Sequence, residues 1–193
     1  SRNNPLTPDE NYQLTALLAG YHAKAFDEQG KLYYTEESFD DFYVGKGSTY
    51  PDVHGAVGIL FEQASSRGHL QDSINGPLSF LSTIDNQFTT SLSTLRGAVE
   101  NKQRLQKWQQ QFFRDSLQLA KDDPVQGYLL QGDADQSRMT ALLHLLSKHQ
   151  IEVYPVSNTE APATQQFFVP LQQRQYRLIK AAFSTATNFR DNT

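Results

Sequence analysis

The chain has 193 residues, a formal net charge of −4 and no cysteine. This length suffices for one or two domains with a proper core. The acidic balance argues against nucleic acid and anionic membrane surfaces as partners, and the lack of cysteine excludes disulfides, thiolate metal sites and a cysteine nucleophile. No apolar run approaches the length of a membrane span.

The first predicted element is a helix that starts at the sequence TPDE. Thr7 can cap this helix, Pro8 suits its first position, and Glu10 completes a capping box. Gly30 is a natural terminator. Apolar residues lie between them at helical spacing: Leu14, Leu17, Leu18, Tyr21 and Ala25.

Residues 31–55 are rich in aromatic residues, acids and glycine but show neither helical nor strand periodicity. They predict an ordered loop, and long ordered loops often carry function. An apolar run, Ala56–Phe61, follows and predicts a buried strand that ends at Glu62. An ionised carboxylate is costly to bury unless it is paired, so Glu62 is either a satisfied structural group or part of a site.

The longest periodic run predicts helix over residues 77–117, packed on the strand 56–61. Its polar face holds mainly Ser, Thr and Gln, whereas a DNA-binding or membrane-surface helix would need a basic face. The pattern is therefore typical of a helix whose apolar stripe faces a core. The stripe comprises Leu78, Leu81, Ile84, Phe88, Leu92, Leu95 and Val99, and it continues past Gly97, a candidate break, with Leu105, Trp108, Phe112, Phe113 and Leu117.

From residue 121 onward, short strands alternate with helices. We predict strands at 125–132, 151–156 and 167–171, and helices at 133–150 and 173–183. Such alternation favours a small, mainly parallel α/β unit. The predicted fold class is therefore α/β, with one domain over residues 1–120 and a small, incomplete accessory domain over 121–193.

Histidine chemistry has weak support in this sequence. His149 and Glu152 have the H-x-x-E spacing of a zinc-ligand pair, but the predicted helix ends near His149 and no third ligand lies nearby. The remaining histidines show no ligand spacing: His22, His54, His69 and His144. His54 and His69 flank the predicted strand that leads to Glu62.

The segment FYVGKGSTYPDVHGAVGILFEQASSRG resembles the C-terminal active-site segment of zinc metallocarboxypeptidases, the carboxypeptidase A-like family, and in particular its bacterial branches. In that family a loop bears a substrate-contacting tyrosine near a Gly-Ser turn. A central strand then ends in the catalytic glutamate, and a turn leads to a long helix. Tyr43, the turn at Gly47 and Ser48, the strand Ala56–Phe61 and Glu62 follow the same order.

The resemblance covers residues from about 5 to 116, which correspond to the last third or so of such a catalytic domain. It implies that Glu62 is the general base of a peptidase that hydrolyses peptide bonds, and that Tyr43 contacts the peptide substrate; Phe42 and Tyr50 are alternatives to Tyr43. It further implies Zn²⁺ in the full-length protein. The family holds this metal with an H-x-x-E pair and a later histidine, all upstream of the matched segment.

None of these zinc ligands is present here, so we expect a C-terminal fragment that is inactive and binds no metal by itself. Two other interpretations stay open. The full-length protein is a non-catalytic, peptidase-like binding module if it too lacks the ligands. Alternatively, the terminal α/β unit is an interaction domain whose function is independent of Glu62.

Overall fold

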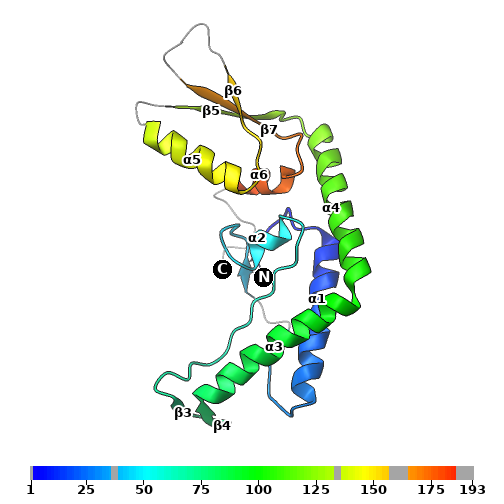
Figure 1. Ribbon diagram of the computed structural model, residues 1–193, viewed down its shortest axis with the longest axis vertical. Coiled ribbons are helices and arrows are strands. Elements are labelled where there is room, and N and C mark those ends of the chain that lie inside the picture. Colours follow the sequence, from blue (N-terminus) through cyan, green and yellow to red (C-terminus); the bar gives the residue numbers. More distant parts are fainter. Residues whose placement is uncertain (1, 36–38, 133–135, 157–164, 186–193) are drawn as a thin grey trace. The chain divides into compact units, whose positions relative to one another are not determined.

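The computed structural model describes residues 2–35, 39–132, 136–156 and 165–185. Helices and short strands alternate along them, as expected of an α/β chain (Figure 1). The residues divide into two compact units. Unit 1 comprises Ser1–Asp52 and Ala56–Gln109, and unit 2 comprises Val53–Gly55 and Gln110–Thr193.

Unit 1 is built mainly from two long helices that pack against each other, α1 and α3 (Figure 1). Its strands form two separate pairs, β1 with β2 in parallel and β3 with β4 antiparallel. The elements are β1 (Arg2–Asn3), α1 (Asp9–Asp27), β2 (Asp40–Asp41), α2 (Thr49–Asp52), β3 (Leu70–Ser73), β4 (Gly76–Ser79), α3 (Phe80–Glu100) and the first part of α4 (Lys102–Asp122).

Helix α1 agrees with its sequence prediction except at its cap. The N-cap residue is Pro8, and no side chain bonds to the first turn, so Thr7 does not cap the helix as predicted. Gly30 ends the helix with a φ of +62°, a conformation that glycine adopts without a steric penalty. Leu14 and Leu18 are buried, as the helical spacing predicted.

The segment Ala56–Phe61 does not form the predicted buried strand. It is irregular, with two residues exposed and four half-buried. A strand needs a neighbour to satisfy its backbone groups, and no strand among the described residues pairs with this segment. Two of its N–H groups donate to local acceptors: the N–H of Ala56 donates to the carbonyl of Pro51 (2.9 Å), and the N–H of Gly58 donates to the Asp52 carboxylate (2.8 Å).

The periodic run 77–117 is largely helical, as predicted, but its apolar stripe does not face a core. Residues 77–79 belong to β4, and Asn101 rather than Gly97 separates α3 from α4. Phe88 on the stripe is 61% exposed, whereas Thr83 on the polar face is 6% exposed. Among the described residues, no helix is both long enough and apolar enough to cross a membrane.

Unit 2 has a three-stranded sheet and its own apolar core. Figure 1 shows α5 and α6 below the sheet. Its elements are the end of α4, β5 (Gly127–Gln131), α5 (Gln136–Lys148), β6 (Tyr154–Val156), β7 (Gln166–Pro170) and α6 (Tyr176–Ala182). The buried apolar residues are Val53, Phe112, Ala120, Leu146, Ile151, Val169, Leu171, Tyr176, Leu178 and Ile179.

The sheet of unit 2 is antiparallel, so the prediction of a mainly parallel unit is wrong. The strand order is β5-β7-β6, and Phe168 in the central strand pairs with Leu129 on one side and Tyr154 on the other. The β5-α5-β6 segment is a crossover, as expected, but the last strand inserts between its two strands. The start of the predicted helix, residues 133–135, lies outside the described residues.

Asp123 joins the end of α4 to α6 through a half-buried cluster of polar contacts. Its carboxylate lies 2.9 Å from Nζ of Lys180 and accepts hydrogen bonds from the Tyr176 hydroxyl (2.8 Å) and the N–H of Val125 (2.8 Å). Lys180 and these two donors lower the pKa of the Asp123 carboxyl to about 2. The folded state therefore favours the ionised form.

We expect Asp123→Asn to lower the free energy of unfolding of unit 2 by on the order of 1 kcal/mol at pH 7, because charge-assisted hydrogen bonds are lost. The folded pKa lies below the unfolded value of about 3.9, so this contribution is present above pH 4 and disappears as the pH falls toward 2. Urea unfolding monitored by circular dichroism measures both effects. Asp122→Asn, in the adjacent exposed position, is the control; equal effects of the two variants would contradict the assignment.

Candidate functional site

The residues on both sides of Glu62 are anchored to the two long helices of unit 1. The Phe61 ring meets the His22 ring edge-to-face, with 4.8 Å between centroids. The side-chain amide of Gln63 donates to the carbonyl of Thr83 (3.1 Å), and Asn86 donates to the Gln63 side-chain oxygen (3.3 Å). The backbone at Glu62 is therefore held at fixed points before and after the carboxylate.

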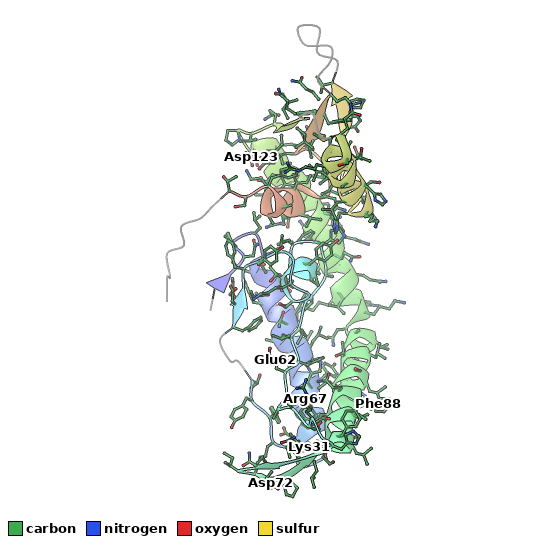
Figure 2. The ribbon with its side chains drawn as sticks, turned by 90° about the vertical axis from the view of Figure 1, so that its left-hand side faces the viewer. Lys31, Glu62, Arg67, Asp72, Phe88 and Asp123 are labelled. Carbon is green, nitrogen blue, oxygen red and sulfur yellow. The ribbon has the colours of Figure 1, made fainter. Side chains whose placement is uncertain are left out.

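Glu62 itself is exposed, and no cation or hydrogen-bond donor among the described residues pairs with its carboxylate. The nearest lysine and arginine in the sequence, Lys46 and Arg67, do not pair with it. Lys46 pairs with Asp40 (3.2 Å), and Arg67 makes no ion pair with Glu62. Figure 2 shows Glu62 and Arg67 at separate points along the segment. The carboxylate is thus open to solvent.

Tyr43 lies in the irregular stretch after β2 and is 64% exposed. Its two competitors for a substrate-contacting role, Phe42 and Tyr50, are half-buried, so Tyr43 is the most accessible of the three. The Asn4 side-chain amide donates to the carbonyl of Phe42 (2.8 Å) and fixes the backbone beside Tyr43. The Tyr43 ring covers Gly45, where an added Cβ would lie 2.4 Å from the ring.

The loop of Tyr43 meets the segment of Glu62 at Ser48 and Gly58. A Cβ added to Gly58 would lie 1.8 Å from the Ser48 carbonyl oxygen, so only glycine fits at this crossing. The Asp52 carboxylate accepts from the N–H of Gly58 (2.8 Å) and from the Asn11 amide of α1 (3.1 Å). One buried carboxylate therefore ties both segments to α1.

Asp52 lies beside a second buried carboxyl, that of Asp41, which accepts a hydrogen bond from the Thr49 hydroxyl (2.6 Å). Burial is the main cause that raises the pKa of Asp52 to about 6, and Asp41 adds to it; the hydrogen bonds from Gly58 and Asn11 act in the opposite direction. Sequence reasoning missed this pair, because acids in a loop show no periodic signal of burial.

The raised pKa of Asp52 makes unit 1 less stable as the pH rises. The folded pKa of about 6 exceeds the unfolded value of about 3.9, so the folded state loses stability between pH 4 and 6, in total on the order of 3 kcal/mol. We expect Asp52→Asn to remove this dependence and to stabilise unit 1 at pH 7, because the amide keeps an acceptor for Gly58 without a charge next to Asp41.

Urea unfolding between pH 4 and 7, followed through the fluorescence of the single tryptophan, Trp108 of unit 1, measures how the free energy of unfolding depends on pH. Asp72→Asn in the exposed β3 serves as the control and should keep the slope of the parent protein. If Asp52→Asn also keeps that slope, the Asp52 carboxyl is not the cause of the pH dependence.

The histidines do not form a common cluster. His22 is buried in α1, bonds through Nε2 to the Thr94 hydroxyl (2.9 Å), and has a pKa lowered by burial. His69 has a φ of +75° and stacks on Phe80 with 5.4 Å between ring centroids. His144 is exposed on α5. His22 and His144 thus behave as ordinary helix residues.

Unit 2 brings His54 close to His149, a proximity that the sequence did not indicate. Burial lowers the pKa of His54, and the charge of His149 lowers it further, whereas a hydrogen bond with Gln175 raises it. The Glu152 carboxylate accepts a hydrogen bond from the Tyr154 hydroxyl (2.7 Å). Within the described parts of the chain, no three His, Asp or Glu side chains come together to hold a metal ion, so these residues do not fit a zinc site.

Comparisons with known proteins add no assignment: no protein-family model, no curated protein and no solved structure matches this chain.

Proposed function

We propose that this chain is the C-terminal part of a zinc-dependent, carboxypeptidase-like catalytic domain that hydrolyses peptide bonds. In this proposal Glu62 is the general base and Tyr43 contacts the peptide substrate. Support comes from the segment that resembles this family, Phe42 to Gly68, and from the state of the glutamate within it. The proposal assigns the zinc ligands to residues upstream of this chain, because the described residues do not fit such a site.

The observation that carries the proposal is the exposed carboxylate of Glu62, which lies between two anchored neighbours and has no partner among the described residues. A glutamate whose role is to hold two segments together bonds to a cation or to an N–H, and the Glu62 carboxylate makes no such bond among the described residues. The residues on either side of it, Phe61 and Gln63, are held by α1 and α3, and its own oxygens find no partner in the part of the chain that the structure describes. This is the arrangement that a proton acceptor for a substrate reaction requires.

The chemistry assigned to this chain is proton transfer. The Glu62 carboxylate would accept a proton from the water that attacks the scissile carbonyl, and the resulting carboxylic acid would return that proton to the leaving amine. Tyr43, exposed on an irregular segment, would donate a hydrogen bond to the substrate and exclude water above it. Zinc in such domains polarises the carbonyl and acidifies water.

A peptidase assay on the full-length protein tests the proposal. We expect the zinc-loaded protein to release free amino acids from the C-terminal end of an unstructured peptide, to lose this activity with a chelator, and to regain it with zinc. Elemental analysis of the 193-residue chain alone should find less than one zinc per chain. A full-length protein that lacks upstream ligands and releases no amino acid would favour the non-catalytic binding module instead.

A further inference from the structure

Helix α3 packs in unit 1 through its polar side. A Cβ added to Gly97 would lie 2.9 Å from Cδ2 of Leu18 and 3.0 Å from the Tyr21 ring, so small residues allow α1 to approach closely on this side. The contact with α1 does not cover the opposite side of the helix. The buried residues of α3 are Thr83, Thr89, Thr90, Ser93 and Gly97.

The opposite side of α3 is an exposed stripe of large apolar side chains. From its first to its last member it spans 18 residue steps, about 27 Å of helix, and none of its members is charged. Figure 2 shows Phe88 on the side of α3 away from α1. A continuous apolar surface of this kind marks a site of interaction. The members of the stripe are 49% to 76% exposed: Leu81, Ile84, Phe88, Leu92, Leu95 and Val99.

The stripe repeats every eleven residues. Such a repeat corresponds to about 3.67 residues per turn, close to the 3.6 of a straight α-helix, so the stripe stays on one side of α3 over its whole length. The pattern is typical of a helix that pairs lengthwise with another helix of the same repeat. Eleven positions separate the members of three pairs: Leu81 and Leu92, Ile84 and Leu95, and Phe88 and Val99.

Two charged residues lie within the span of the stripe, and they favour one direction of pairing. Asp85 and Arg96 each follow a stripe residue by one position and are themselves eleven residues apart, so both lie on the same flank of the stripe. Arg96 has no ion-pair partner among the described residues, and the Asp85 side chain, which contacts Nζ of Lys31, is 59% exposed. The other flank, with Gln87 and Ser91, is uncharged. In an antiparallel pair equal flanks face each other, so the acid of one helix meets the base of the other.

We infer that the apolar stripe of α3 binds the same stripe of a second copy of this chain, with the two α3 helices antiparallel. A two-fold axis near residue 90 brings Phe88 of one copy beside Leu92 of the other, and it pairs each Asp85 with the Arg96 of the other copy. The interface buries both stripes and forms two ion pairs. The stripe is thus self-complementary, as a two-fold interface between identical chains requires.

Two observations favour a second copy over a lipid surface. A membrane-surface helix carries several basic residues beside its apolar face, but Arg96 is the only basic residue of α3. Anionic lipid would repel Asp85 on the same flank, whereas Arg96 of a second copy neutralises it. The inference uses α3 alone, so it goes beyond the proposed function and does not depend on it.

Sedimentation velocity of the 193-residue chain over a range of concentrations tests the inference. We expect a dimer, and we expect Leu92→Glu to raise its dissociation constant by on the order of a hundredfold, because the new charge would be buried in the interface without a partner. Gln87→Glu adds the same charge to the same helix outside the stripe and should leave the dimer intact. Both positions are exposed in the single chain, and circular dichroism checks that both variants are folded.

Cysteine cross-linking tests the direction of pairing, because the chain has no cysteine of its own. In the antiparallel pair Ile84 lies level with Leu95 of the other copy, whereas the two copies of Ile84 lie about 12 residue steps, ~18 Å, apart, too far for a disulfide. We expect a mixture of Ile84→Cys and Leu95→Cys chains to form a disulfide-linked dimer under mild oxidation, and neither variant to do so alone. Cross-links within each variant alone would indicate parallel pairing and overturn the inference.

Three other results would also overturn it. A parent chain that sediments as a monomer at every concentration has no such interface. A monomer that floats with vesicles of phosphatidylcholine and phosphatidylglycerol uses the stripe on lipid instead. A dimer that Leu92→Glu leaves unchanged is held together by another surface. These experiments report association, so none of their outcomes bears on the role of Glu62.

Discussion

Gly58→Ala should unfold or strongly destabilise unit 1, by on the order of 3 kcal/mol. The added Cβ would lie 1.8 Å from the Ser48 carbonyl oxygen and 2.8 Å from the Ser48 Cα, and backbone atoms cannot rotate away as the end of a side chain can. The crossing must open, and the hydrogen bond from Gly58 to the buried Asp52 carboxylate is then lost.

Gly47→Ala is the matched control for this prediction. It lies one residue from Ser48 in the same turn, but nothing lies within 4 Å of a Cβ added there. We expect it to change the free energy of unfolding by less than about 1 kcal/mol. Thermal unfolding followed by Trp108 fluorescence compares the two variants. Similar midpoints for Gly47→Ala and Gly58→Ala would show that the close crossing does not hold the two segments together.

The sequence predicted those parts of the fold that depend on local patterns. The helix ended by Gly30, the largely helical nature of 77–117 and the strands and helices of unit 2 follow from periodicity and terminators a few residues apart. The antiparallel order β5-β7-β6 did not follow, because the position of the last strand depends on contacts with residues nearly 40 positions earlier. Alternation of strands and helices alone favours neighbours that run parallel.

The two larger errors concern surfaces rather than elements. The stripe from Leu81 to Val99 predicted the helix correctly, but periodicity does not say whether the partner for an apolar face lies within the same chain. The strand prediction for Ala56–Phe61 failed for the same reason, because a strand exists only where a neighbour accepts its hydrogen bonds. Both errors concern apolar surface that finds no partner among the described residues.

The candidate site was only partly predictable. Glu62 and Tyr43 were proposed from a family resemblance, and the structure adds how each is held: Glu62 between anchored neighbours, Tyr43 above Gly45. The buried pair of Asp41 and Asp52 gave no signal in the sequence. Acids in an aromatic-rich loop are usually solvated, and Asp52 is held inside by a hydrogen bond from Asn11, 41 residues earlier in the chain.

Glu62→Gln in the zinc-loaded full-length protein should reduce turnover by on the order of a hundredfold or more. Glutamine keeps the shape of the side chain but cannot accept and return a proton. Because the Glu62 carboxylate has no partner among the described residues, its neutralisation breaks no structural contact, and the midpoint of thermal unfolding should not change. Glu28→Gln, at the exposed end of α1, is a matched control that should keep full activity.

Whether Glu62 is the general base is decided by the turnover number of Glu62→Gln, measured on a peptide substrate together with zinc content and thermal midpoint. We expect turnover to fall by on the order of a hundredfold or more, with one zinc per protein and an unchanged midpoint. An active Glu62→Gln variant, or one whose loss of activity follows a loss of stability, would contradict the assignment of Glu62 as the general base.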